Sequence, residues 1–299
     1  STIAAGYRRC MSVKRLLILS GKGGTGKTTV SSAFVEFSKA RAVADCDVDA
    51  PNLHLILNRR EEPQHTVFFG GEKAFLDQEL CINCGACQKA CRFDAIRFSK
   101  EKYEIWEYAC EGCGVCAYVC PVHAITMKED VAGELFLYEG EQVFSTAMLK
   151  MGRGNSGKLV TEVKKNMLKA ASDAELAIID GSPGIGCPVI ASMSGMDLIL
   201  IVAEPSVSGK SDLQRLVETA GSFQMRITVC VNKWDTNPEK TREIEAYCKE
   251  QGLSFVGKIP YDKTVSAAIN AGQSVARLEC RARTALLQIY EAVREELNI

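Results

Sequence analysis

The sequence predicts an α/β protein with a doubly wound parallel sheet, into which a small α+β domain is inserted. Short apolar runs of strand length alternate with longer helical patterns over most of the 299 residues. This alternation is typical of a parallel sheet that helices cover on both faces. A glycine-rich segment lies between the first apolar run and the first helical pattern, and a cysteine-rich stretch interrupts the alternation and marks the insert.

The first predicted strand, 15–20, reads RLLILS, and a helical pattern follows at 27–40. The remaining strands are short and apolar, whereas the remaining helical patterns are longer and carry one apolar stripe. We expect strands at 41–45, 176–179, 198–203 and 227–231, and helices at 159–171, 211–223, 239–251 and 281–297. The segment 133–144 predicts a hairpin that returns the chain from the insert to the main domain.

Composition restricts the function classes. The net charge is -1, so the basic surplus that nucleic-acid binding needs is missing and no nucleic-acid partner is expected. The longest apolar stretch, 198–203, is far too short to span a bilayer. No secretory signal is apparent in the first twenty residues. We therefore expect a soluble, cytoplasmic protein without a membrane partner, and we assign no function to residues 1–10.

The segment 21–28 reads GKGGTGKT and fits the phosphate-binding pattern G-x-x-x-x-G-K-[ST]. It follows a predicted strand and begins a predicted helix, which is the context that this motif needs. Glycines let main-chain N–H groups approach a phosphate closely. We expect Lys27 to reach the β- and γ-phosphates and the Thr28 hydroxyl to bind Mg²⁺. The predicted nucleotide-binding residues here are Gly21, Gly23, Gly24, Thr25, Gly26, Lys27, Thr28 and Thr29.

A second lysine, Lys22, lies inside this loop. The sequence GKGGTGKTT resembles the variant P-loop of the MinD, ParA, Mrp and nitrogenase iron-protein family. In that family the extra lysine reaches across a dimer interface to the nucleotide of the partner. The resemblance implies that Lys22 acts in this way and that the chain forms a homodimer or a heterodimer with a paralogue.

Two acidic segments resemble the switch regions of the same family. The segment 45–52, DCDVDAPN, resembles the first switch, and we expect Asp47 to orient the attacking water, with Asp45 and Asp49 as alternatives. The segment 177–184, AIIDGSPG, resembles the second switch. An acid at the end of a buried strand is costly unless it meets a cation, so Asp180 is expected to hold Mg²⁺ through water. The N–H group of Gly184 is expected to sense the γ-phosphate.

The base is predicted to lie near 232–235, where NKWD matches the N-K-x-D pattern that reads guanine in many GTPases. In MinD-type proteins the asparagine contacts adenine instead, and a stretch that 259–262 resembles lies over the base. The resemblance implies ATP, bound by Asn232, Pro260 and Asp262. The tetrapeptide alone leaves GTP as an alternative.

Eight of the 14 cysteines lie between residues 81 and 120. The run C-x2-C-x2-C-x3-C occurs twice, as in bacterial two-cluster ferredoxins, where the fourth cysteine of each run binds the other cluster. We therefore predict two 4Fe-4S clusters. Zinc is an alternative that triplet spacing disfavours, and disulfides are not expected in a reducing compartment. The first cluster is assigned to Cys81, Cys84, Cys87 and Cys120, and the second to Cys110, Cys113, Cys116 and Cys91.

Together these motifs resemble MinD-superfamily ATPases that carry an inserted ferredoxin domain. The expected ATPase domain covers 14–60 and 145–299, and the ferredoxin domain covers 73–128. The resemblance implies slow, partner-stimulated ATP hydrolysis that is coupled to electron transfer toward an unidentified redox partner. One alternative is an Mrp-like ATPase that passes iron–sulfur clusters or metal to an apo-metalloprotein. Another is a positioning ATPase of the ParA or MinD kind, which the charge balance disfavours.

Cys187 lies seven residues after Asp180. In the nitrogenase iron protein, a cysteine at a similar distance from this aspartate binds a cluster that two subunits share. That enzyme needs two such cysteines in each chain, and no clear second one is present here. We therefore expect a buried structural thiol, with a metal or redox role as the alternative.

Overall fold

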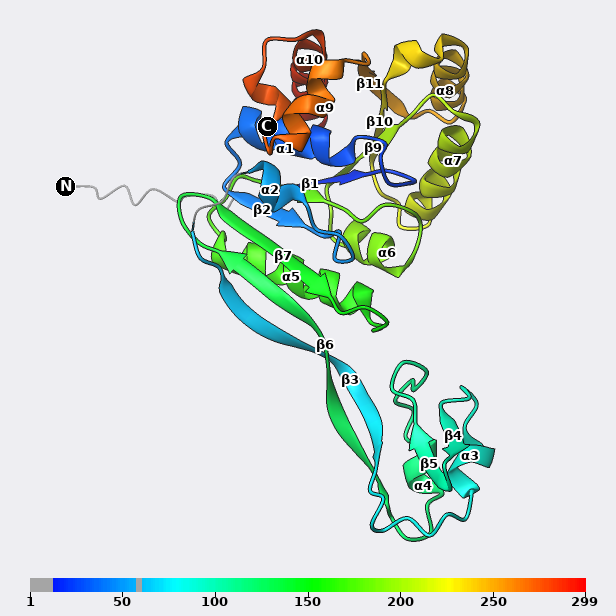
Figure 1. Ribbon diagram of the computed structural model, residues 1–299. Helices are drawn as coiled ribbons and strands as arrows, with labels where there is room; N and C mark the ends of the chain where they lie inside the picture. The colour runs from blue at the N-terminus through cyan, green and yellow to red at the C-terminus, as the bar shows by residue number, and fades with distance from the viewer. Residues whose placement is uncertain (1–12, 58–60) are drawn as a thin grey trace, which may run out of the picture.

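The computed structural model describes residues 13–57 and 61–299, and one large sheet forms its centre (Figure 1). Within those ranges, nine strands pair in the order β11-β10-β9-β1-β8-β2-β7-β6-β3. Every pairing from β11 to β7 is parallel, whereas β6 and β3 join antiparallel at one edge. The predicted α/β fold with a mostly parallel sheet is confirmed.

The elements of the main domain alternate along the chain as the sequence predicts. The parallel strands are β1 (Lys14–Leu19), β2 (Ala42–Asp45), β7 (Val143–Leu149), β8 (Leu176–Asp180), β9 (Leu198–Ala203), β10 (Ile227–Asn232) and β11 (Ser254–Ile259). The helices are α1 (Lys27–Ser38), α2 (Leu53–Ile56), α5 (Ser156–Ala170), α6 (Cys187–Met193), α7 (Val207–Gly221), α8 (Pro238–Glu250), α9 (Lys263–Asn270) and α10 (Arg281–Leu297), with 3-10 turns at Trp234–Thr236 and Val275–Arg277.

Helices cover both faces of the sheet, so the central strands are apolar on both sides. In β1, Leu17 and Leu19 belong to the core under α5, α6 and α7, whereas Leu16 and Ile18 belong to the core under α1 and α10. All four side chains are fully buried. Burying each one stabilises the fold by about 2 kcal/mol. The apolar stripe of α10 packs against the second core, which confirms the expectation for the C-terminal helix.

A long two-stranded ribbon leaves the edge of the sheet (Figure 1). It consists of β3 (Gln64–Leu76) and β6 (Ile125–Tyr138), which pair antiparallel along most of their length. The pairing register shifts around Phe69 and Gly71, where the ribbon departs from the sheet. β6 also pairs antiparallel with β7, so the hairpin predicted at 133–144 is confirmed. Residues 73 and 128, the predicted ends of the insert, lie within the two strands of this ribbon.

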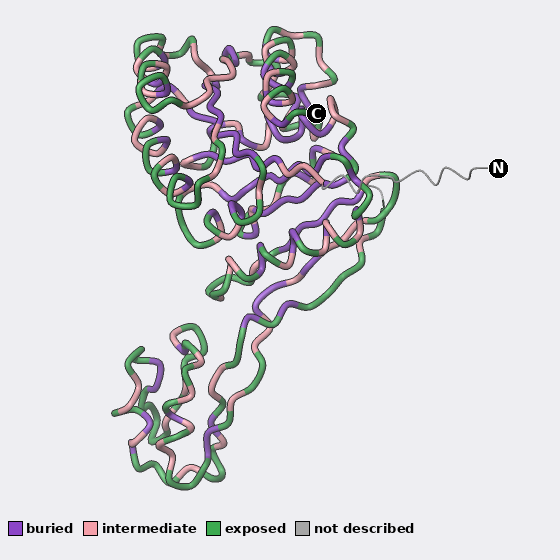
Figure 2. The backbone as a smooth tube through the Cα atoms, turned by 180° about the vertical axis from the view of Figure 1, so that it is seen from behind, coloured by how far each residue is buried: buried purple, intermediate pink, exposed green. Residues whose placement is uncertain are grey.

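The tip of the ribbon carries residues 77–124, which we call the cysteine module. It contains α3 (Ala86–Ala90), a hairpin of β4 (Ile96–Ser99) and β5 (Lys102–Ile105), and α4 (Val115–Tyr118). The sequence duplication is visible in its backbone, because α3 and α4 each begin after a left-handed glycine. Burial is concentrated in the main sheet and is sparse in the module (Figure 2). Among the described residues, no helix has the length and apolar character needed to cross a bilayer.

Candidate functional site

A cavity of about 730 Å³ opens at the carboxyl ends of the parallel strands. Open α/β sheets bind ligands at this edge, and the volume is typical of a small-molecule site. The phosphate loop, the first acidic segment and the segment 259–262 all contribute to its wall. The predicted site residues that line it are Lys22, Gly23, Gly24, Gly26, Lys27, Thr28, Thr29, Asp47, Asn232, Pro260 and Asp262.

The phosphate loop is held in shape by its own polar groups and by the neighbouring strand β10. The carbonyl oxygen of Lys22 accepts hydrogen bonds from the hydroxyls of Ser20 and Thr25, each at 3.0 Å. The Asn232 side-chain amide donates to the carbonyl oxygen of Thr25 at 2.7 Å. Gly26 has a φ of +99°, and a Cβ there would lie 2.2 Å from the Asn232 amide. Only glycine therefore fits at this position.

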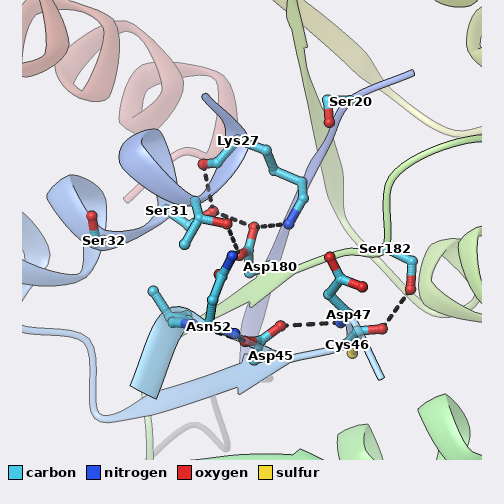
Figure 3. Close-up of polar contacts among 12 residues, drawn as sticks. Ser20, Lys27, Ser31, Ser32, Asp45, Cys46, Asp47, Asn52, Asp180 and Ser182 are labelled. Atoms are coloured by element: carbon cyan, nitrogen blue, oxygen red, sulfur yellow. Dashed lines mark hydrogen bonds and ion pairs between the residues drawn. The ribbon is translucent and has the colours of Figure 1, made fainter. Parts of the chain in front are cut away.

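Asp180 is the centre of a buried polar cluster at the end of β8 (Figure 3). Its carboxylate accepts from the Lys27 ammonium at 2.7 Å, from the Thr28 hydroxyl at 2.9 Å and from the Ser31 hydroxyl at 2.7 Å. Burial lowers the pKa of Lys27, but the carboxylates of Asp180 and Asp45 outweigh that effect and raise it. Lys27 is therefore a fixed cation beside the cavity.

Asp45 and Asp47 have different surroundings, although they are two residues apart. Asp45 is fully buried and accepts main-chain hydrogen bonds from Asp47, Asn52 and Leu53, each at 3.0 Å. Burial and the nearby charge of Asp180 raise its pKa to about 7. Asp47 instead lines the cavity, and burial raises its pKa too. Asp45 thus shapes the loop, while Asp47 faces the space where a nucleotide would bind.

Three residues that the sequence predicted to bind phosphate contact other parts of the protein in the structure. The N–H group of Gly184 donates to the carbonyl oxygen of Ser20 at 3.0 Å, so it does not point into the cavity. Gly21 packs against Asp212, whose Cβ lies 2.1 Å from the position of a Gly21 Cβ. Lys22 pairs with Glu204 of the same chain and donates to the Ser208 hydroxyl at 3.0 Å.

The N-K-x-D segment also uses its polar groups within the protein. The side-chain Oδ1 of Asn232 accepts from the N–H of Lys233 at 3.0 Å, in addition to the contact of its Nδ2 with the phosphate loop. The Asp235 carboxylate accepts from the N–H of Tyr261 at 2.7 Å. Asp262 caps α9 through Thr264, and these hydrogen bonds lower its pKa. Asp235 therefore ties the N-K-x-D segment to the loop that carries Pro260 and Asp262.

The eight clustered cysteines form two separate groups in the cysteine module. One small cavity is lined by Cys81, Cys84, Cys87 and Cys120, and another by Cys91, Cys110, Cys113 and Cys116. These are the two sets that the sequence spacing assigned, including the exchange of the fourth cysteine. All eight thiols are free. In the part of the chain that the structure describes, no three acidic, histidine or cysteine side chains converge closely enough for a single metal ion.

Comparison with known proteins identifies the family. Residues 16–275 match the CobQ/CobB/MinD/ParA nucleotide binding domain. The chain belongs to this family. An uncharacterized protein of Methanocaldococcus jannaschii is 36% identical over 75% of this chain and 80% of its own length. The cytosolic Fe-S cluster assembly factor Nubp1 homolog of Drosophila melanogaster is 22% identical over 89% of this chain and 76% of its own.

Solved structures share the fold of this MinD/ParA-family chain. The septum site-determining protein MinD of Pyrococcus horikoshii, complexed with Mg-ADP, superposes with a TM-score of 0.58 at 18% identity, covering 94% of this chain and 96% of its own. McdA of Cyanothece, in complex with ATP, has a TM-score of 0.58 at 20% identity, covering 96% and 97%. These likenesses concern the fold and not the ligand of this chain.

The structure corrects the expectation for Cys187 and adds three residues to the candidate site. Cys187 is exposed at the start of α6, so the expectation of a buried thiol is wrong. Its burial could not be judged from sequence, because it depends on how the short α6 packs. Ser31, one helical turn after Lys27, completes the Asp180 cluster, and this spacing was a usable signal. The segment 204–210 fits the family pattern, but the sequence indicated no contact of Glu204 or Ser208 with Lys22, because that contact depends on how β9 and α7 pack beside the phosphate loop.

Proposed function

We propose that this MinD/ParA-family protein binds and hydrolyses ATP with Mg²⁺ between two subunits. In the proposal, nucleotide-dependent movement of its switch segments controls electron transfer through two 4Fe-4S clusters in the cysteine module. One observation carries the proposal: a strand ribbon that is continuous with the ATPase sheet ends in eight cysteines, which line two cavities in sets of four.

The Asp180 cluster supports a nucleotide-driven switch. In the structure, the Asp180 carboxylate accepts hydrogen bonds from Lys27 and Thr28. Mg-ATP would compete for both residues, since the Lys27 ammonium can bind the β- and γ-phosphates and the Thr28 hydroxyl can bind Mg²⁺. Asp180 could then contact the metal through water, and its strand leads directly into Gly184 and α6. Asp47 orients the attacking water, and Lys22 of a second subunit neutralises charge on the phosphates.

The base end of the cavity favours ATP over GTP. Guanine readers of the N-K-x-D type need the aspartate carboxylate for the base. Here the Asp235 carboxylate accepts a hydrogen bond from the Tyr261 main chain and holds the base loop in place. Adenine can bind without a hydrogen bond to that carboxylate. We therefore assign the triphosphate as ATP.

The donor set fits two iron–sulfur clusters. Such clusters require thiolate ligands, and each cavity is lined by four cysteine thiols that would lose their protons on binding iron. A bound 4Fe-4S cluster supplies one-electron redox chemistry. Cys87, Cys110 and Cys116 are buried, whereas Cys84 and Cys113 are exposed, so each set has an inner and an outer side. The protein residues hold the clusters and limit access of solvent to them.

The loop between β7 and α5 also contacts the ribbon and the cysteine module directly. The guanidinium of Arg153, in the loop between β7 and α5, pairs with Glu107 at 2.7 Å and with Asp130 at 3.2 Å. Lys73 of the ribbon donates to the carbonyl oxygen of Cys110 at 2.9 Å. These contacts give movement of the ATPase domain a physical route to the second set of cysteines.

Anaerobic purification followed by spectroscopy tests the proposal. We expect about eight irons per chain and a cluster signal that a non-hydrolysable ATP analogue changes, either in midpoint potential or in rate of reduction. Cys113→Ser should remove one cluster signal, whereas Cys280→Ser is the matched control outside the module. The proposal is contradicted if the protein binds no iron, or if the cluster potential and the reduction rate are the same with and without the nucleotide analogue.

The Nubp1 likeness favours a second candidate, an ATPase that assembles iron–sulfur clusters on other proteins. This candidate predicts a labile cluster that moves to an apo-protein in an ATP-dependent way. Transfer to an apo-ferredoxin, followed by absorbance, distinguishes the two functions. Transfer accelerated by ATP supports assembly, whereas retained clusters that are reduced and reoxidised repeatedly support electron transfer.

A further inference from the structure

Lys22 is held by two side chains of its own subunit. Its ammonium pairs with the Glu204 carboxylate and donates to the Ser208 hydroxyl at 3.0 Å. The Lys22 side chain is 39% exposed and that of Glu204 is 19% exposed, so water screens the pair only in part. Burial opposes ionisation of Glu204, but hydrogen bonds from Lys22 and Ser206 lower its pKa. Glu204 is therefore a carboxylate when it meets the lysine.

Both partners of the pair are fixed at their main chains. The hydroxyls of Ser20 and Thr25 hold the carbonyl oxygen of Lys22. Glu204 follows β9, which pairs with β1, so its main chain lies beside the phosphate loop. A Cβ on Gly209 would lie 2.3 Å from the carbonyl oxygen of Glu204, so α7 packs tightly against this turn. The Lys22 side chain can therefore rotate and bring its ammonium to another partner while its main chain stays in place.

We propose that Glu204 is a positioning residue that holds Lys22 against its own subunit and thereby sets the protein concentration at which ATP-bound subunits pair. The inference rests on the proposed function, in which Lys22 reaches the nucleotide of a second copy. One ammonium cannot pair with Glu204 and with that nucleotide together. Pairing of subunits therefore requires both lysines of a dimer to leave their glutamates. A triphosphate carries more charge than one carboxylate, so the exchange is favoured when ATP is present.

Glu204→Gln tests the proposal, because glutamine keeps the size of the side chain and its hydrogen bond with Ser206 while removing the charge. Sedimentation with Mg²⁺ and a non-hydrolysable ATP analogue measures dimer formation. Loss of one partly exposed ion pair changes an equilibrium constant by about five-fold. Formation of a symmetric dimer breaks two such ion pairs, one in each subunit. We expect the dimer dissociation constant to fall about 25-fold. ATPase activity should reach half its maximum at a correspondingly lower protein concentration, with kcat at saturation unchanged.

Three further variants keep the test sharp. Ser208→Ala removes only the hydrogen bond, so it should shift dimer formation in the same direction by about two-fold for each subunit, or about four-fold for the dimer. Glu204→Asp restores the charge and should return the dissociation constant toward that of the unchanged protein. Glu243→Gln is the matched control, since Glu243 pairs with Lys210 and Lys240 on the surface and should have no effect.

The outcome for Lys22→Ala separates this inference from the proposed function. If Lys22→Ala abolishes ATP-dependent pairing while Glu204→Gln leaves pairing unchanged or weakens it, the inference is overturned and the two-subunit site remains. If Lys22→Ala pairs and hydrolyses ATP normally, the role of Lys22 across the interface is itself wrong. Tighter pairing by Glu204→Gln that disappears in the double variant with Lys22→Ala supports the inference.

Discussion

The Asp180 carboxylate accepts three side-chain hydrogen bonds at a position that water does not reach. A buried ion pair of this kind contributes little net stability, but breaking it leaves an unpaired charge inside the protein. The same residue is therefore a structural requirement of the fold, and in the proposed function it would also contact Mg²⁺. Two measurements at the scale of single residues follow from this arrangement.

The first measurement removes the cation. Lys27→Met keeps the length and apolar stem of the side chain but leaves Asp180 without its charge partner. We expect the free energy of unfolding in urea to fall by about 3 kcal/mol. Thr28→Val, which removes one hydrogen bond from the same carboxylate, should cost only about 1 kcal/mol. Equal losses in the two variants would show that the charge of Lys27 does not stabilise Asp180.

The second measurement concerns Asp45, whose pKa rises from 3.8 in the unfolded chain to about 7 in the fold. Between these values the folded state holds a proton that the unfolded state releases. Its contribution to stability is therefore complete below about pH 4 and is lost as pH rises through 7, by an amount on the order of 4 kcal/mol. Asp45→Asn should flatten this part of the curve of unfolding free energy against pH. Asp173→Asn, at an exposed position, should leave the curve unchanged, and a curve for Asp45→Asn parallel to that of the unchanged chain would contradict the prediction.

At the scale of elements, the loop between β7 and α5 joins the two parts of the protein. Arg153 pairs with Glu107 and Asp130 and lies over the ring of Tyr108. At the start of α5, directly after this loop, Gly157 packs on the carbonyl of Cys187 in α6, so contact continues toward the candidate nucleotide cavity. α6 directly follows the segment that contains Asp180. This loop is thus the short connection between the nucleotide cavity and the module.

Arg153→Ala should loosen the cysteine module without affecting nucleotide binding. The guanidinium contacts are lost, whereas the ribbon strands remain paired. We expect hydrogen–deuterium exchange at 106–112 to become several-fold faster, while exchange in β1 and α1 stays the same. Arg226→Ala, which removes a surface pair with Glu296, is the control. Unchanged exchange at 106–112 would show that the ribbon alone positions the module.

The sequence predicted those elements whose burial is uniform or periodic. β1 and β9 are apolar on both faces, and α10 has one continuous apolar stripe, so the sequence pattern identifies each of these elements. β3 was missed because most of its side chains are exposed, so neither face gives a period-two apolar signal. α2, with four residues, is too short for a helical period. The phosphate loop and Asp180 were predicted from local motifs, but the contact of Glu204 with Lys22 depends on which strands become neighbours.

At the scale of the whole molecule, stability is unevenly distributed. The main sheet has two extensive cores. The core around the cysteine module consists of a few side chains, among them Ile96 of the module and Leu76 and Ile125 at the end of the ribbon, together with cysteines. A domain of this size rarely folds on its own without metal or disulfides. Its cysteines are free, so in the proposed function iron bound by them would stabilise it.

Removing iron should therefore unfold the module and spare the ATPase domain. Chelated, reduced protein should be cut by protease within 77–124, while the sheet resists and the chain still binds ATP. Restoring iron and sulfide should restore resistance, whereas zinc at equal concentration should not. Equal resistance with and without iron would show that the module folds without a cluster. Loss of ATP binding on iron removal would show that the ribbon transmits unfolding into the sheet, and the two parts would then fold as one unit rather than as a stable ATPase with a metal-dependent extension.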